Sequence, residues 1–188
     1  MAGTVTDAVL VLGAITGLDP DDPATNAGAE RAERDYTPYL DPRGLEGSRI
    51  GLATQYAEGH ERVEELFQGA LEVMRGAGAT VVEIPEVDAW RRMGGPSGSL
   101  MRYEFKADLN AYLAGLGPEA PVKSLQDVID FNEANASREL PFFQQEILYQ
   151  CQELGPLSED GYREALEEAM RLSRDEGIDA VMAEHRLD

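Results

Sequence analysis

Two short apolar stretches frame a helical pattern in this sequence: R-I-G-L-A at residues 49–53 and V-V-E-I at residues 81–84. Both have the length of a buried strand, and Pro85 directly follows the second one. Between them, apolar residues recur at helical spacing, namely Val63, Leu66, Phe67, Ala70, Val73 and Met74. A strand, a helix and a strand within about 35 residues fit a right-handed parallel crossover. The sequence therefore predicts a βαβ unit over residues 49–85.

The N-terminal part predicts a buried helix followed by a long connection. Thr4 and Asp7 form a loose capping box, and Gly17 is a natural helix end. The residues between them are apolar or small on nearly every side, so we expect residues 1–17 to form a buried helix. Residues 18–48 show little periodicity and contain the turn sequence D-P-D-D-P. A connection of this length predicts a loop that wraps a larger body.

Helical spacing dominates the rest of the chain. The expected seams are Met101, Phe105, Leu109, Tyr112 and Leu116; Val128 and Ile129; Phe143, Ile147, Cys151 and Leu154; and Tyr162, Ala165, Leu166, Ala169 and Leu172. Residues 99–186 are therefore expected to form a helical segment. The predicted fold class is α/β, with one βαβ unit and a helix-rich second half. Two strands do not make an independent parallel sheet, so the predicted sheet has open edges.

Charge and composition exclude several classes of protein. The 188 residues include 36 Asp and Glu against 16 Lys and Arg, which gives a formal net charge of −20. A surface this acidic repels phosphate backbones and anionic lipids, so we expect no nucleic-acid and no membrane partner. The apolar run at residues 8–15 is too short to span a bilayer. The single cysteine, Cys151, cannot form an internal disulfide, which favours a reducing, cytoplasmic compartment.

The sequence offers no convincing metal site. His60 and His185 lie far apart without the spacing of a zinc motif, and solvated histidines explain them better. Asp19, Asp21 and Glu30 match three positions of a calcium loop, but Pro23 stands where that loop needs an oxygen ligand. We therefore expect no metal and no cofactor.

Two features around residues 94–110 could carry chemistry. The Gly/Ser-rich stretch at residues 94–99 precedes Lys106, and a serine activated by a neutral lysine is known chemistry. The alternative is a flexible connector in which Ser99 caps the next helix. Arg102, Lys106 and Asn110 then form a polar stripe at helical spacing. This stripe could meet an anionic or amide group, or it could be a solvated helix face.

Short motifs occur in a fixed order along nearly the whole chain. They are M-A-G-T-V-T-D-A at residues 1–8, D-P-D-D-P-A-T at 19–25, G-L-x-G-x-R-I-G at 44–51, Y-E-F-K at 103–106, L-N-x-Y-L at 109–113, F-N at 131–132, R-E-L-P at 138–141 and G-I-D-A at 177–180. In this order they resemble the amidase signature family, and most closely its peptide amidase-like branch. The resemblance implies that residues 1–188 form a partial amidase domain, the middle segment of an α/β/α fold.

The resemblance also implies a function, and it implies that the catalytic residues for this function lie outside the segment. Family members hydrolyse amide bonds, including peptide amides, through a serine nucleophile, a second serine on a cis peptide bond and a lysine. The family places all three before the segment that Met1 opens, so no residue here inherits a catalytic role. Ser97, Ser99 and Lys106 lie downstream and in reversed order, and Gly3 stands where the family usually has an arginine.

Three functions remain open on this basis. The first is a middle fragment of an amidase that is inert alone, and the second is a non-catalytic subunit that pairs with a chain carrying the signature region. The third is a small enzyme with a new site at Ser97, Ser99 and Lys106. If the helix after Ser99 walls the amide pocket, the expected substrate-side residues are Arg102, Tyr103, Lys106 and Asn110, because polar groups beside an aromatic body suit a peptide-like ligand.

Overall fold

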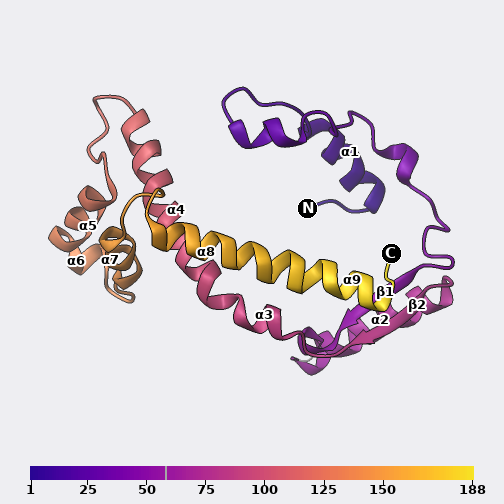
Figure 1. Ribbon diagram of the computed structural model, residues 1–188. Coiled ribbons are helices and arrows are strands. Elements are labelled where there is room, and N and C mark those ends of the chain that lie inside the picture. Colours follow the sequence, from indigo (N-terminus) through magenta and orange to yellow (C-terminus); the bar gives the residue numbers. More distant parts are fainter. Residues whose placement is uncertain (58) are drawn as a thin grey trace. The chain divides into compact units, whose positions relative to one another are not determined.

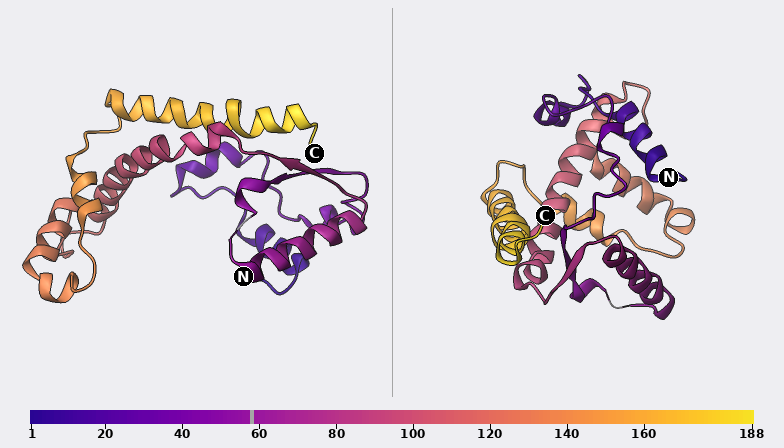
Figure 2. Two further views of the ribbon diagram at one scale, coloured as in Figure 1. Left: turned by 90° about the horizontal axis from the view of Figure 1, so that it is seen from below. Right: turned by 90° about the vertical axis from the view of Figure 1, so that its right-hand side faces the viewer.

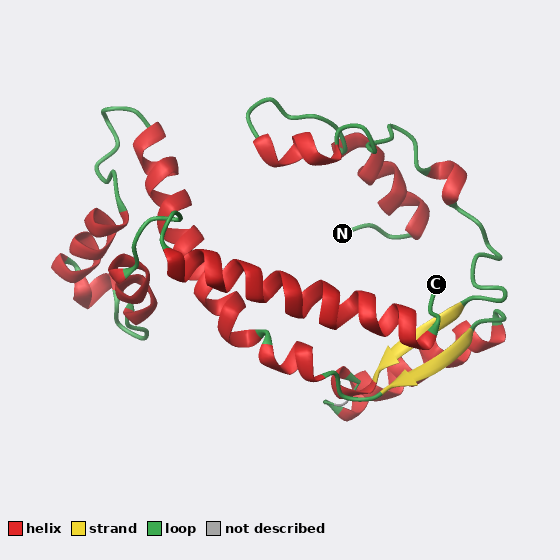
Figure 3. Cartoon of the chain, in the orientation of Figure 1, coloured by secondary structure: helices red, strands yellow, loops and turns green. Residues whose placement is uncertain are grey.

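The computed structural model describes residues 1–57 and 59–188 (Figure 1). These residues form helices and one two-stranded parallel sheet (Figure 3), so the predicted α/β class is confirmed. The chain divides into two compact units. The first comprises Met1–Ile50, Ala57–Val82 and Asp188, and the second comprises Gly51–Tyr56 and Glu83–Leu187. Within the described residues, every helix is too short or too polar to cross a membrane.

The βαβ unit lies where the sequence predicts it. Strand β1 spans Arg49–Ala53, helix α2 spans Glu61–Gly76 and strand β2 spans Thr80–Ile84. A short 3₁₀ turn, η3 (Thr54–Tyr56), follows β1, and the Thr54 hydroxyl donates to the Ile84 carbonyl at 3.0 Å. Gly51 allows close packing, because a Cβ there would lie 2.5 Å from Leu187 Cδ1 and 3.2 Å from Ile84 Cγ1, and these side chains would have to move.

The first unit contains the predicted N-terminal helix. Helix α1 spans Val5–Ile15, and the Thr4 hydroxyl caps it by accepting from the Asp7 amide at 3.1 Å. The following connection carries two 3₁₀ turns, η1 (Pro23–Gly28) and η2 (Thr37–Tyr39). It approaches α1 so closely that a Cβ on Gly13 would lie 2.6 Å from the Arg34 carbonyl oxygen. Whether the connection wraps a larger body stays a prediction.

The predicted burial of the N-terminal helix is wrong for this chain. No residue of α1 is buried, and Val5 and Ile15 are 73% and 76% exposed. The reason is that η2 and the neighbouring connection are the elements that contact α1 in this unit, and they leave most of its surface uncovered. Helix α2 behaves in the same way, because it buries Leu71 while Leu66 of the predicted apolar seam stays exposed.

The second unit is built from helices. They are α3 (Asp88–Arg92), α4 (Gly94–Gly115), α5 (Leu125–Ala134), α6 (Ala136–Glu139), α7 (Glu146–Glu153), α8 (Asp160–Met170), the π-helical segment η4 (Arg171–Ile178) and α9 (Asp179–His185). The last three follow one another as a long rod (Figure 2), with α4 packed on α8 and α3 packed on η4. Leu125, Ile129 and Cys151 form a buried cluster between α5 and α7, which Leu109 of α4 contacts.

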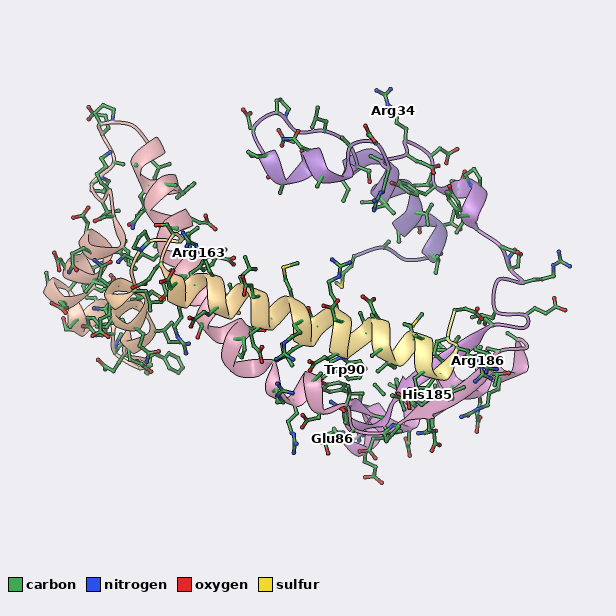
Figure 4. All side chains as sticks on the ribbon, in the orientation of Figure 1. Arg34, Glu86, Trp90, Arg163, His185 and Arg186 are labelled. Carbon is green, nitrogen blue, oxygen red and sulfur yellow. The ribbon has the colours of Figure 1, made fainter. Side chains whose placement is uncertain are left out.

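The rod bends at Gly177. Its dihedral angles (φ −101°, ψ −110°) are not helical, and the side chain of Trp90 on α3 lies against it. A Cβ at this position would collide with the carbonyl oxygen of Leu172 and lie 3.0 Å from Trp90 Nε1 (Trp90 is labelled in Figure 4). Gly177 therefore lets α3 approach the rod.

Two predictions about α4 need correction. The stretch at residues 94–99 is not a connector, and Ser99 is not a cap, because α4 already begins at Gly94. Pro96 is compatible with this start because it lies within the first turn, where backbone N–H groups lack helical partners. The buried residues of α4 are Tyr103 and Leu113; of the predicted seam, Leu109 contacts the buried cluster while Met101 remains 70% exposed. The buried side is the one that packs on α7 and α8.

Candidate functional site

The second unit contains a hollow of about 680 Å³ between α4 and α7. The segment that joins α6 to α7 closes it from a third side. Its lining is mostly apolar and comprises Met101, Phe105, Leu140, Phe143, Ile147, Leu148 and Cys151. Ligand sites commonly have volumes of roughly 300–1,000 Å³ and a mainly apolar lining with few polar groups. The hollow is therefore the candidate binding site.

A network of amide side chains fixes one wall of the hollow. Gln145 is 5% exposed, and its Nε2 donates to the Ile129 carbonyl at 3.2 Å and to the Tyr149 hydroxyl at 3.0 Å. Its Oε1 accepts from Asn132 Nδ2 at 2.9 Å, and the Tyr149 hydroxyl donates to Glu133 at 2.8 Å. Of these residues Gln145 is buried, and a buried polar side chain whose hydrogen bonds are all made holds its neighbours in place. The wall that joins α5 to α7 is thus held in one arrangement.

Arg102 is the cationic side chain at this hollow. It projects from α4, is half-buried, and donates from Nη1 to the Gly98 carbonyl at 3.1 Å. A guanidinium has five N–H donors, so this bond leaves donors for a ligand oxygen. Arg102 is the one substrate-side candidate that lines the hollow.

Cys151 lines the hollow as a thiol rather than as a nucleophile. It is 1% exposed, and burial raises its pKa, which the positive charge of Arg102 opposes to a smaller extent. A raised pKa keeps the reactive thiolate scarce near neutral pH. Cys151 therefore contributes apolar surface.

Lys106, on the same helix, binds the end of α7. Its Nζ donates to the carbonyl oxygens of Gln152 at 2.7 Å and of Leu154 at 2.6 Å. The last carbonyls of a helix lack partners within the helix and carry partial negative charge, so an ammonium group stabilises them. Because this ammonium is engaged by α7, it does not serve as a base beside Ser97 or Ser99. Nothing in the described residues supports the third hypothesis.

Asn110 and Tyr103 also connect α4 to neighbouring helices. Asn110 Oδ1 accepts from the backbone amide of Leu125, the first residue of α5, at 2.8 Å. The Tyr103 hydroxyl donates to Glu159 Oε2 at 2.9 Å, just before α8, and this hydrogen bond raises the pKa of the phenol. The Tyr103 ring meets the Tyr162 ring edge-on, with centroids 5.7 Å apart.

The polar stripe on α4 is therefore not a solvated face. Arg102, Lys106 and Asn110 are half-buried and each is hydrogen-bonded within the chain. That alternative is wrong, because Lys106 bonds to the end of α7, Asn110 bonds to the start of α5, and Arg102 bonds to Gly98 on its own helix. A direct substrate contact by Arg102, Tyr103, Lys106 or Asn110 stays a prediction, and the structure places Arg102 at the hollow and the other three at contacts beside it.

In the part of the chain that the structure describes, the histidines and acidic residues do not form a metal site. His60 caps α2, where its Nδ1 accepts from the Arg62 amide at 3.2 Å. Across the described residues, no three His, Cys, Asp or Glu side chains are grouped to hold a metal ion. His60 therefore has a structural role that the sequence analysis missed.

Sequence reasoning also missed part of the site. Helical spacing places Phe143 and Ile147 only on a seam, and it marks neither Asn132 nor Gln145 as a site residue. The stretch R-E-L-P-F-F-Q-Q at residues 138–145 could have indicated Phe143 and Gln145, because amides and aromatics follow a proline there. This stretch lines the hollow opposite α4, and spacing along the chain does not predict such a contact.

No family model matches the chain. Over 193 aligned residues, which cover 98% of the chain, it is 34% identical to a probable amidase from Arabidopsis thaliana. The native peptide amidase from Stenotrophomonas maltophilia superposes on the whole chain with 40% sequence identity and a TM-score of 0.87. The chain belongs to the amidase signature family. The prediction from the ordered motifs is thus confirmed, including the likeness to peptide amidases.

As an amidase-signature chain, it corresponds to a part of its relatives. It spans 35% of the length of the Arabidopsis protein and 38% of the Stenotrophomonas structure. A peptide amidase solved in complex with the competitive inhibitor chymostatin also superposes on the whole chain, with 40% identity and a TM-score of 0.90. Helices α4 to α7, which form the hollow, lie inside the superposed region.

Proposed function

We propose that this chain is a segment of an amide-bond hydrolase that supplies substrate-binding surface and does not hydrolyse amides by itself. The observation that carries this proposal is the hollow between α4 and α7, in a chain that superposes along its whole length on peptide amidases. The substrate is a peptide amide or a small amide, since one of these relatives is a peptide amidase that binds a competitive inhibitor. No cofactor takes part.

The proposed inertness follows from the chemistry that amide hydrolysis needs. The reaction requires an activated nucleophile and hydrogen-bond donors aimed at the developing oxyanion. Ser97 and Ser99 lie on the first turns of α4, while the Lys106 ammonium donates to carbonyl oxygens of α7. Cys151 is buried, with its pKa raised. These groups do not form a nucleophile and base pair.

Turnover assays on the 188-residue chain test this proposal. A fluorogenic amide and a peptide amide should both remain intact, and a fluorophosphonate probe should label no serine. Turnover by the chain alone that disappears in Ser97→Ala, Ser99→Ala or Lys106→Ala would refute the proposal in favour of a self-contained site. The proposal also predicts that turnover appears when the separately expressed remainder of a peptide amidase, which carries the signature serines, is added to the chain.

A second candidate function is favoured by a separate observation. Large apolar side chains project from both helices of the first unit, where Ile15 of α1 is 76% exposed and Leu66 of α2 is 77% exposed. Exposed apolar patches commonly mark interaction sites. The chain would then be the non-catalytic subunit of a split amidase, bound to a chain that carries the signature region. Its acidic charge makes nucleic acid and anionic membranes poor partners, and its single cysteine suits the cytoplasm.

Two substitutions that place a charge on the exposed apolar surface test this second candidate function. Ile15→Glu and Leu66→Glu should weaken binding to the signature-bearing chain, because a charge cannot be buried in an apolar interface without a large cost. The control is Glu61→Gln, at the start of α2, which should leave binding unchanged. Equal binding by all variants in size-exclusion chromatography would refute the split-subunit role.

A further inference from the structure

The hollow presents aromatic and branched aliphatic surface from three different segments. Phe105 comes from α4, Phe143 from the stretch before α7, and Ile147 from α7 itself. Phe143 is 85% exposed and Ile147 is 60% exposed, so both side chains offer surface that a ligand can still cover. Covering apolar surface is worth about 25 cal/mol per Å². The hollow should therefore bind a ligand with a large apolar group more tightly than a ligand without one.

The volume of the hollow exceeds what a bare carboxamide needs. About 680 Å³ lies within the range of roughly 300–1,000 Å³ that holds drug-sized ligands. Beneath it, the hydrogen-bonded pair Asn132 and Gln145 fixes the wall, so little ordering is needed when a ligand enters. A group of the size of an amino-acid side chain with its backbone suits this space.

The charges at the hollow favour a neutral ligand. Arg102 is opposed by the carboxylates of Glu139 and Glu146, which also line the hollow, and the whole chain carries a net charge of −20. An anionic ligand is repelled by this field. The donors that Arg102 does not use on Gly98 can instead bind a neutral carbonyl oxygen.

We propose that the hollow is a side-chain pocket that selects peptide amides bearing a large apolar residue, aromatic or branched aliphatic, with Phe105, Phe143 and Ile147 as the selecting residues. In this assignment Arg102 donates to a backbone carbonyl of the ligand and contributes equally to all peptide amides. The inference rests on the proposed function for its substrate class, and it adds which members of that class are bound.

Binding to the 188-residue chain tests the inference without any need for turnover. The probes are N-acetyl-phenylalanine amide, N-acetyl-leucine amide and N-acetyl-glycine amide, titrated into ¹⁵N-labelled protein and followed by amide chemical shifts. The phenylalanine and leucine amides should each bind about tenfold more tightly than the glycine amide, which corresponds to the burial of part of one apolar side chain. The shifts should fall on the residues of α4 and α7 that line the hollow.

Two neighbouring phenylalanines provide a matched pair of variants. Phe143 lines the hollow, whereas Phe142 is 88% exposed and does not. Phe143→Ala should reduce the preference for the phenylalanine amide over the glycine amide to about threefold or less, while Phe142→Ala should leave it unchanged. Arg102→Met should weaken the binding of the phenylalanine amide and of the glycine amide by a similar factor, so the preference for the phenylalanine amide should remain.

Specific outcomes would overturn the inference. They are equal affinity for the three amides, an equal loss of preference in Phe142→Ala and Phe143→Ala, or shifts confined to the first unit. Failure of the proposed function is distinguishable, because it would show as absent turnover with the signature-bearing remainder while selective binding persists. Turnover with that remainder but no selectivity in binding would refute only the side-chain pocket.

Discussion

The Nζ atom of Lys106 lies 2.6 Å from the carbonyl oxygen of Leu154, the C-cap residue of α7. With its second bond, to Gln152, this ammonium ties the middle of α4 to the C-terminal end of the helix that forms the opposite wall of the hollow. Lys106 thus stabilises the walls of the hollow although its own side chain does not line it. Lys106 is therefore a positioning residue, and its replacement should destabilise α7 before the other helices.

Lys106→Met should lower the free energy of unfolding by about 1.5 kcal/mol, because hydrogen bonds to charged groups contribute about 1.5–3 kcal/mol and this one is half-buried. The measurement is urea denaturation, with hydrogen exchange of the α7 amides as a local readout. Arg163→Met is the control, since its ion pair with Asp160 is exposed and should change stability by no more than about 0.5 kcal/mol. Unchanged exchange in α7 would contradict the assignment.

Asn110→Ala should destabilise the start of α5 by about 1 kcal/mol, because the Leu125 amide loses its acceptor in a partly buried place. Asn110→Asp keeps an oxygen in position and adds favourable charge at a helix N-terminus, so it should restore the loss. Both variants are compared by urea denaturation. If Asn110→Asp is as unstable as Asn110→Ala, the capping role is wrong.

Tyr103→Phe should make stability less dependent on alkaline pH. The hydrogen bond to Glu159 raises the pKa of Tyr103 above its usual value of 10.0. Because the folded chain holds the phenolic proton more tightly than the unfolded chain, this contribution is complete below pH 10 and is lost as the pH rises through the raised pKa. The difference in unfolding free energy between the parent chain and Tyr103→Phe should therefore shrink from pH 9 to pH 12. A constant difference would show that the loss of the hydroxyl acts through packing alone.

Gly177→Ala should destabilise the second unit by about 2 kcal/mol or more, because the added methyl group meets the Leu172 carbonyl and the indole of Trp90. The readouts are thermal unfolding and the emission of Trp90, which should shift to longer wavelength as α3 is displaced. Gly69→Ala is the control, since a Cβ there meets nothing within 4 Å and the residue is in helix α2. That control should be neutral or stabilising.

Spacing along the chain was sufficient to predict the elements, and the order of short motifs was sufficient to predict the family. Local periodicity located β1, α2 and β2 to within two residues, and Thr4 marked the start of α1, because strands, helices and caps depend on spacing along the chain. The order of the short motifs was enough to identify the amidase family. No single motif is decisive, but several weak motifs in the family's order together are. Charge composition likewise followed from counting residues.

The contacts of each helix face, in contrast, depend on the folded arrangement of the helices. The periodicity of α1 and α2 predicted an apolar face but not whether anything covers it, and Ile15 and Leu66 proved exposed. Spacing put Arg102, Lys106 and Asn110 on one stripe, yet their roles differ, because a pocket wall, a C-terminal cap and an N-terminal cap depend on helices that come later in the chain. Such contacts join residues 15 to 48 positions apart, a distance at which periodicity carries no information.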